Sequence, residues 1–463
     1  MSIHARTKDN NQGVVVSKLF GILPNDEAVN EFCRRIGGKT LQSLCEENKH
    51  LLVFPRGWET AGGDYDEWET SAIFHVGEKK ETKEKVLWTG NLMGFVGCGD
   101  VSLTIASRFY PNGDDFFLHY LLQRVAGFHV VDLPHPTASE NPAGDFLPYL
   151  FPSYFMAAWR QGVYRVGRRF ERNDDRVKGS IDIARHVRLN IPFRGKIAYT
   201  FSERSADNPM TRLIRLAVDV LEKDRRFNAM FHGADRDFRE AVSELKRLVG
   251  EESIRNVARV VRENLKPVAH PFYSAYKPLQ RLCQAILRHK RIAFTESENT
   301  IHGVLFDGAW LWEEYLAKIM PTGITHAKNK SKRNGYEPAK NKAWGVWYPD
   351  FYAKRVIALD AKYKDLDQNA DSESARADRH QLVAYMHTLG AERGGFIYPG
   401  KANVTLVEGM SNAEVVLNGL GGMVRKFRLS IPGEGGGEYK AFCQNMAEVE
   451  RAFCAEIIKF AKP

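Results

Sequence analysis

The stretch WYPDFYAKRVIALDAKYK, residues 347–364, decides the fold of the last third of the chain. Two apolar runs flank a polar Lys-Arg pair, and this pattern predicts a β-hairpin with a tight turn at the pair. Asp350 lies on the first predicted strand, while Asp360 and Lys362 lie two residues apart on the second. Because alternate residues of a strand point to the same face, we expect Asp360 and Lys362 to share a face.

Helix and strand patterns alternate on both sides of this hairpin. A helix is expected at residues 309–320 and a short strand at 323–327, before a lysine-rich loop that leads to the hairpin. After the hairpin come a helix at residues 377–389, which Gly390 ends, and a strand at 395–398. The predicted order is αβββαβ, and a further strand and helix close the chain.

The polar residues of the hairpin, Asp350, Asp360 and Lys362, form the candidate catalytic centre. Two carboxylates that converge across neighbouring strands offer hard oxygen ligands, which suit Mg²⁺, and Mn²⁺ is expected to substitute for it. The adjacent lysine is placed to orient or deprotonate an attacking water, or to stabilise the charge that builds on phosphorus. The combination resembles the PD-(D/E)xK motif of metal-dependent DNA endonucleases.

A purely structural interpretation of the same residues stays open. ExK triplets also occur at residues 78–80, 81–83 and 438–440, so the spacing by itself is a weak signal. An Asp-Lys ion pair at a strand end would also produce this pattern. The apolar run at residues 356–359 favours a site, because charged groups at its end are costly to bury without a metal or a partner.

The composition favours a soluble, folded protein with a polyanionic partner. The chain has 463 residues and a formal net charge of +9. Such a charge favours nucleic acid through the release of counterions, although charge alone does not decide the question. The six cysteines form no CxxC pair, which indicates a reducing, cytoplasmic setting. Neither a secretion signal nor an apolar run of membrane-spanning length is present, so no membrane partner is expected.

The chain is predicted to be a multidomain α+β protein. Residues 1–135 indicate a β-rich N-terminal domain, residues 136–270 a mainly helical middle region, and residues 271–463 the α/β nuclease core with its C-terminal strand and helix. The strand patterns of the first region lie at residues 14–20, 51–54, 72–76, 85–89 and 101–106. The helices of the middle region are expected around residues 150–170, 209–222 and 235–248.

Several stretches together resemble the McrC family of restriction endonuclease subunits, close to its LlaJI-type branch. They are the hairpin with LWEEYL before it and RHQLVAYMHTLG after it, IASRFYP at 105–111, VKGSIDIARHV at 177–187 and YTFSERSADNPMTRLIRLA at 199–217. The resemblance covers most of residues 90–400. It implies a PD-(D/E)xK endonuclease subunit of a restriction system that defends against phage. It also implies a partner, an McrB-like AAA+ GTPase ring, and residues 1–135 are expected to dock on that ring.

The resemblance also implies roles for individual residues. The three polar residues of the hairpin match the nuclease motif of the family. The acidic residue of the preceding helix is matched by Glu313, with its neighbour Glu314 as the competing choice. The polar QxxxY face of the following helix is matched by Gln381 and Tyr385, and Gln381 is expected to serve the catalytic site.

The lysine-rich loop before the hairpin is the candidate DNA-binding surface. Its basic residues alternate with Tyr336, Trp344 and Trp347, which is typical of surfaces that follow a nucleic-acid backbone. The basic residues are Lys328, Lys330, Lys332, Arg333, Lys340 and Lys342. A solvated surface loop is the competing interpretation. A second basic cluster at residues 165–178 would extend this track or dock an acidic face of a partner.

Two functions of other classes stay open: a non-catalytic adaptor that couples a motor to DNA, and a PD-(D/E)xK nuclease of DNA repair or recombination. Nucleotide hydrolysis by the chain itself is not expected. The stretch Gly37-Gly38-Lys39-Thr40 lacks the first glycine of a P-loop, because Cys33 occupies that position. Gly37 is better explained as the end of a helix.

Overall fold

The computed structural model divides the chain into two compact units. Unit 1 comprises Met1–Leu150 and Thr295–Pro463, and unit 2 comprises Phe151–Phe294. These limits differ from the predicted boundaries near residues 135 and 270, because a strand that begins after residue 300 joins the N-terminal sheet. The residues that the structure describes are 3–22, 26–48, 50–54, 71–79, 83–110, 116–126, 147–224, 227–228, 231, 236–289, 301–328, 333–340, 344–366, 373–401, 414–419, 421–433 and 439–462.

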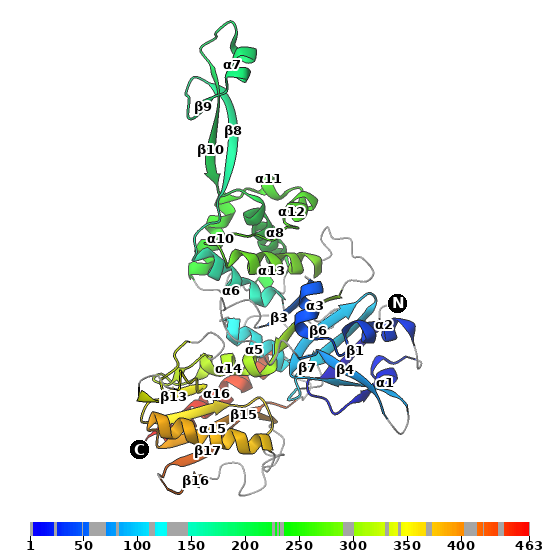
Figure 1. The fold of residues 1–463 in the computed structure, drawn as a ribbon, viewed down its shortest axis with the longest axis vertical. Coiled ribbons are helices and arrows are strands. Elements are labelled where there is room, and N and C mark those ends of the chain that lie inside the picture. Colours follow the sequence, from blue (N-terminus) through cyan, green and yellow to red (C-terminus); the bar gives the residue numbers. More distant parts are fainter. Residues whose placement is uncertain are drawn as a thin grey trace. The chain divides into compact units, whose positions relative to one another are not determined.

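In the described part of unit 1, the N-terminal sheet has five strands in the order β1-β7-β6-β11-β3 (Figure 1). They are β1 (Ile3–Lys8), β3 (His50–Phe54), β6 (Leu92–Cys98), β7 (Val101–Ala106) and β11 (Ile301–Asp307). β11 pairs antiparallel with β6 and parallel with β3. Glycine is required where β6 meets β11, because a Cβ on Gly94 would lie 2.1 Å from the carbonyl oxygen of Val304.

A smaller sheet in the order β2-β5-β4 and several helices complete this region. The elements are β2 (Val14–Val15), β4 (Phe74–Glu78), β5 (Lys85–Thr89), α1 (Val16–Phe20), α2 (Glu27–Ile36) and α3 (Leu41–Glu47). The strand predicted over residues 14–20 is wrong beyond Val15, because the following residues form α1 and bury its apolar side chains. α2 begins after Asp26, whose side chain accepts a hydrogen bond from the backbone of Val29, and ends at Gly37 as predicted.

The C-terminal part of unit 1 is built on a sheet in the order β12-β13-β14-β15-β17-β16. Its strands are β12 (Thr325–His326), β13 (Phe351–Ala353), β14 (Ile357–Ala361), β15 (Arg393–Lys401), β16 (Val415–Val416) and β17 (Met423–Ile431). The helices nearby are α5 (Phe116–Ala126), α14 (Gly308–Ile319), α15 (Glu373–Leu389) and α16 (Tyr439–Ala461). The chain therefore passes through α14, β12, β13, β14, α15 and β15, which is the order that the sequence predicts.

α15 and α16 cover opposite faces of this sheet. Ala358 of β14 and Phe396 of β15 belong to one apolar cluster with residues of α15. The ring of Phe427 on β17 meets Phe460 of α16 with centroids 5.3 Å apart. Because side chains alternate along a strand, Asp360 lies on the same face as Ala358 and points toward α15.

A buried carboxylate joins α5, α14 and α16. Glu450 accepts hydrogen bonds from the hydroxyl groups of Tyr120 at 2.6 Å and Tyr315 at 2.9 Å, and it also pairs with Arg124. Burial raises the pKa of both tyrosines, and the charge of Glu450 raises it further, so their hydroxyl groups remain donors. This network holds α14, the helix that carries Glu313, against the core.

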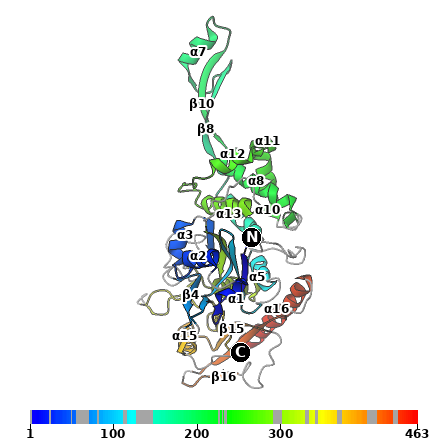
Figure 2. The ribbon, with the colours of Figure 1, turned by 90° about the vertical axis from the view of Figure 1, so that its right-hand side faces the viewer.

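Unit 2 combines a group of helices with a long antiparallel hairpin (Figures 1 and 2). Its helices are α6 (Leu147–Trp159), α7 (Ile183–Asn190), α8 (Pro209–Lys223), α10 (Arg236–Leu248), α11 (Glu251–Ile254), α12 (Val257–Glu263) and α13 (Tyr276–His289). Its strands are β8 (Val166–Asp174), β9 (Ser180–Ile181) and β10 (Ile197–Ser205). The helix predicted over residues 150–170 is wrong after Trp159, because residues from Val166 onward form β8.

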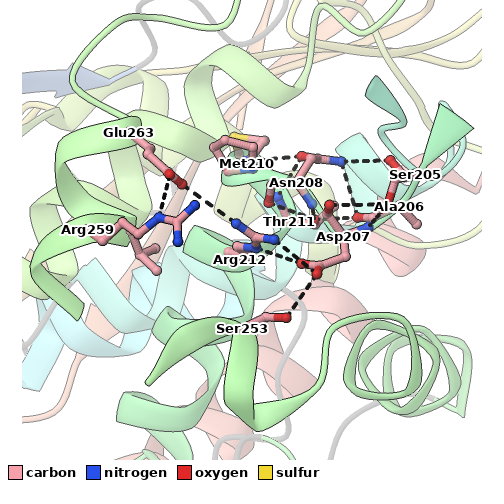
Figure 3. Close-up of polar contacts among 12 residues, drawn as sticks. Ser205, Ala206, Asp207, Asn208, Met210, Thr211, Arg212, Ser253, Arg259 and Glu263 are labelled. Atoms are coloured by element: carbon pink, nitrogen blue, oxygen red, sulfur yellow. Dashed lines mark hydrogen bonds and ion pairs between the residues drawn. The ribbon is translucent and has the colours of Figure 1, made fainter. Parts of the chain in front are cut away.

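One buried amide connects both ends of this hairpin to α8 (Figure 3). Asn208 caps α8 by accepting hydrogen bonds from the backbone N–H groups of Met210 at 3.1 Å and Thr211 at 3.2 Å. Its Nδ2 donates to the carbonyl oxygens of Tyr164, just before β8, and Ala206, just after β10. Asn208 thus joins both ends of the hairpin to the start of α8, and Thr211 adds a second hydrogen bond to the carbonyl oxygen of Ala206.

Within the described residues, no helix has the length and hydrophobicity needed to cross a membrane.

Candidate active site

The hairpin of β13 and β14 brings the motif residues together. Asp350 and Asp360 lie opposite each other, one position beyond the last paired residues of the two strands. Asp350 precedes β13 directly, and its Oδ2 accepts a hydrogen bond from the backbone N–H of Ala361 at 2.6 Å. On the second strand, the Nζ of Lys362 lies 2.7 Å from the Oδ2 of Asp360. The two side chains therefore share a face, as the spacing predicts.

Burial and like charges make the acidic pair bind protons more tightly. Asp360 is only 3% exposed, and burial raises the pKa of its carboxyl group; the charge of Asp378 adds to the increase and Lys362 opposes it. Burial also raises the pKa of Asp350 well above its usual range, and the charges of Glu313 and Asp360 raise it further. A bound cation would relieve this repulsion.

Lys362 keeps its positive charge in these surroundings. Burial acts to lower the pKa of its ammonium group, but the charges of Asp360, Asp378 and Asp350 together raise it above the usual value for lysine. A charged ammonium group can orient a water molecule or stabilise negative charge, but it cannot accept a proton. The geometry thus favours these roles over deprotonation of the attacking water.

The two glutamates of α14 have different partners. Glu313 Oε1 lies 2.9 Å from Nε2 of His326, which is on β12. Glu314 instead accepts a hydrogen bond from the ammonium group of Lys328 at 2.7 Å. The charge of Glu313 also raises the pKa of Asp350, which favours Glu313 over Glu314 as the acidic residue of the site.

Asp378 of α15 belongs to this cluster as well, and it is not among the site residues predicted from the sequence. One of its oxygens lies 3.3 Å from Nζ of Lys362, and the other pairs with Lys364. Lys364 also donates to the hydroxyl group of Ser374 at 2.9 Å. A signal was present in the sequence, since Asp378 lies one helical turn before Gln381 on the predicted helix.

Gln381 reaches the centre through Tyr385. Its Nε2 donates to the hydroxyl group of Tyr385 at 3.0 Å. Burial raises the pKa of Tyr385, and the charges of Asp350 and Asp360 contribute to the increase, so Tyr385 lies near the acidic pair. Both QxxxY residues line a cavity of about 360 Å³. The residues that line it are Val346, Trp347, Tyr348, Gln381, Ala384 and Tyr385.

The candidate DNA-binding loop is described in part. Lys328 is paired with Glu314, as noted above, whereas Arg333 and Lys340 are exposed. Three other lysines predicted to bind DNA lie outside the described residues: Lys330, Lys332 and Lys342. Arg333 and Lys340 are therefore the described residues of this loop that offer exposed positive charge.

The acidic pair fits a divalent cation of the Mg²⁺ type. Oδ2 of Asp360 is buried and, apart from its ion pair with Lys362, has no hydrogen-bond partner among the described residues. In the same part of the chain, no three His, Cys, Asp or Glu side chains converge to hold a metal together. Mg²⁺ needs only one or two carboxylates, because water and phosphate oxygens complete its octahedron. Asp350 and Asp360 meet that requirement.

Comparison with known proteins gives a family match and matches to solved structures. No curated protein matches the chain. A chain of the refined half-complex from the tetradecameric assembly of Thermococcus gammatolerans McrB AAA+ hexamers with bound McrC matches with a TM-score of 0.53 at 13% identity. That match covers 98% of this chain and 100% of that chain, and it supports a shared fold. A chain of the cryo-EM structure of the Thermococcus gammatolerans McrBC complex reaches a TM-score of 0.31 at 13% identity, over 68% of this chain and 86% of that one.

The family match covers the hairpin and its surroundings. The model of the family described as McrBC 5-methylcytosine restriction system component matches residues 87–399. This range contains Asp350, Asp360 and Lys362, and it agrees with residues 90–400, over which the sequence resembles the McrC family. The resemblance is thereby confirmed. Because the match extends over more than half of the chain, the chain belongs to the family of McrBC 5-methylcytosine restriction system components.

Proposed function

We propose that this restriction system component is the endonuclease subunit, which hydrolyses phosphodiester bonds of DNA with Mg²⁺. The observation that carries the proposal is the pairing of a buried Asp360 with a half-buried Asp350 beside a charged Lys362. A structural ion pair needs one carboxylate for one lysine, yet three carboxylates, including Asp378, act on Lys362. This excess of negative charge favours a cation site over a purely structural role.

Each residue of the centre has a proposed part in the reaction. Asp350 and Asp360 would hold the cation, which when bound polarises the phosphate and activates water. Lys362 stabilises the negative charge that builds on the phosphate oxygens. Glu313 is hydrogen-bonded to His326. Its negative charge, like that of Asp360, raises the pKa of Asp350. Mn²⁺ is proposed to support the same reaction, since it also prefers oxygen ligands.

The substitution Asp360→Ala tests the nuclease assignment. We expect the reconstituted complex to lose cleavage by at least about a hundredfold, because one of the two cation-holding carboxylates is gone. Circular dichroism shows whether the variant folds, and Glu373→Gln, an exposed position on α15, serves as the control. Undiminished cutting by Asp360→Ala would overturn the assignment.

Calorimetry separates this proposal from a non-catalytic adaptor. We expect Mg²⁺ to bind the wild-type chain and to bind Asp350→Asn much more weakly, because the substitution removes one of the two proposed ligands. An adaptor whose acidic pair is structural would give the same titration for both proteins. The family match favours a restriction system over DNA repair or recombination.

We also propose that an McrB-like AAA+ ring activates the chain. The similar Thermococcus gammatolerans assembly contains McrB AAA+ hexamers with bound McrC. Docking through residues 1–135 remains a prediction. The outer part of the unit 2 hairpin, residues 181–193, which we call the hairpin tip, is a second candidate because large apolar side chains are exposed there. These side chains are Ile181, Ile183, Val187, Leu189, Ile191 and Phe193.

The basic cluster at residues 165–178 is part of the same hairpin. β8 carries Arg169 and Arg172, which are exposed, and exposed Arg176 and Lys178 follow the strand. Arg165 is also exposed just before β8. This charge, next to an exposed apolar tip, supports either predicted role, a DNA track or contact with an acidic partner surface.

A further inference from the structure

A group of aromatic rings beside the acidic pair has no part in the proposed cleavage reaction. The cavity of about 360 Å³ has Trp347, Tyr348 and Tyr385 among its walls. Trp344 stacks on Trp347 with ring centroids 6.3 Å apart and planes at 19°. Trp347 in turn meets Tyr385 edge to face at 5.9 Å. Trp344 is 67% exposed, so a large part of this indole faces solvent.

Contacts within the loop and with α15 hold these rings in place. Two backbone hydrogen bonds, of 3.0 and 2.8 Å, join Tyr336 and Trp347. The hydroxyl group of Tyr336 is 2.6 Å from Oγ1 of Thr388 on α15. Tyr348 lies so close to Gly335 that a Cβ there would be 2.5 Å from its ring. The cavity is therefore preformed, which reduces the entropy lost when a ligand binds.

The chemistry of the cavity fits a flat, polar heterocycle. Ring faces offer stacking, and the amide of Gln381 offers hydrogen-bonding groups at the cavity wall, of which Nε2 donates to Tyr385. Arg333 and Lys340, exposed on the same loop, add positive charge that suits a phosphodiester backbone. The cavity adjoins the acidic pair along the chain, since its wall residue Tyr348 stands two residues before Asp350, where the scissile phosphate is proposed to lie. Its other wall, α15, packs on the sheet face to which Asp360 belongs.

We propose that this cavity binds an unstacked nucleobase of the DNA strand whose phosphate lies at Asp350 and Asp360. The inference rests on the proposed nuclease function and names its substrate as a strand that is locally unpaired. A single strand supplies such a base directly, whereas a duplex must release one from its stack. In this arrangement Gln381 contacts the base edge, while its catalytic role stays a prediction.

Affinity measurements on the full chain test the proposal in the absence of metal. The DNA is a single strand, and the comparison is a strand of equal length made only of abasic nucleotides, both in EDTA. We expect Trp344→Ala to weaken binding of DNA about tenfold, the usual effect of removing one stacking ring. Binding of the abasic strand is expected to stay unchanged. Trp344→Phe should restore most of the affinity, and Trp88→Ala, another exposed indole, is the control.

Cross-linking shows where the base lies. Thymidine is replaced by 5-iododeoxyuridine, and we expect ultraviolet light to link the strand to residues 344–348 or 381–385. A duplex that carries the same base tells whether paired DNA also delivers it. Cross-links elsewhere, or equal loss of affinity for both strands in Trp344→Ala, would overturn the proposal. Neither measurement depends on cleavage. A negative result here would overturn the base-binding proposal, whereas continued cutting by Asp360→Ala would overturn the nuclease assignment.

Discussion

The position of Lys362 depends on residues from two elements. Its ammonium group lies 2.7 Å from Asp360 on its own strand and 3.3 Å from Asp378 on α15. Asp378 also pairs with Lys364, so one carboxylate holds both lysines at the end of β14. We therefore regard Asp378 as a positioning residue for the nuclease centre.

We predict that Asp378→Asn lowers the cleavage rate about tenfold, which corresponds to the loss of one charge-assisted contact. Because the charge of Asp378 raises the pKa of Lys362, its removal lowers that pKa. The single-turnover cleavage rate of the reconstituted complex with Mg²⁺ measures the loss.

Glu373→Gln is the matched control for Asp378→Asn, because Glu373 is exposed on the same helix. Its cleavage rate should equal that of the wild type. An Asp378→Asn rate equal to that of Glu373→Gln would show that Asp378 does not position Lys362.

Only part of this centre could be predicted from the spacing of residues. A hairpin keeps Asp350, Asp360 and Lys362 in register over a short stretch, so the local pattern was sufficient for them. The nearness of Asp378 depends on the packing of α15 on the sheet, which no local pattern encodes. The choice between Glu313 and Glu314 required their partners, His326 and Lys328, to be placed in space.

Among the elements, β11 shows why the domain boundaries were hard to predict. The run Ile301–Asp307 pairs with β6 and β3, which lie about two hundred residues or more earlier in the chain. Pairing over such a distance is invisible to periodicity. α14 begins where β11 ends, and the Asp307 side chain caps it. The N-terminal sheet thus sets the start of the helix that carries Glu313.

In unit 2, Asn208 stabilises the junction between the hairpin and α8. We predict that Asn208→Ala destabilises the unit by about 1–2 kcal/mol, because it removes the cap of α8 and the hydrogen bond that Asn208 donates to the carbonyl oxygen of Tyr164. Hydrogen exchange should become faster for backbone amides at the ends of β8 and β10 that lie next to α8. Amides of α7, at the other end of the hairpin, should be unaffected.

Asp182→Ala is the matched control for Asn208→Ala, because Asp182 caps α7 with a hydrogen bond from the backbone of Arg185. It should speed exchange in α7 and leave the hairpin base unchanged. If both variants gave the same exchange pattern, Asn208 would have no specific role at the base.

At the scale of the whole molecule, the exposed apolar side chains of the hairpin tip require an explanation. Soluble proteins rarely gather large apolar residues on an exposed surface without a partner. Ile183, at 74% exposure, and Phe193, at 66%, are the most exposed aliphatic and aromatic side chains of the tip. Arg188, which lies between them in sequence, and Arg194, which follows Phe193, are also exposed. A surface of this composition suits a protein partner with an acidic, partly apolar face.

We therefore predict that the double substitution Ile183→Ser and Phe193→Ser weakens binding to the McrB-like AAA+ ring by at least about tenfold, since two buried apolar contacts would be lost. Gel filtration of the mixed proteins and the affinity of the isolated pair measure this loss. Val415→Ser with Val416→Ser, equally exposed apolar positions on β16 in unit 1, is the control and should bind the ring normally. If the tip variant bound the ring with full affinity, the hairpin tip would not be the docking surface. Residues 1–135 would then have to supply the contact with the ring.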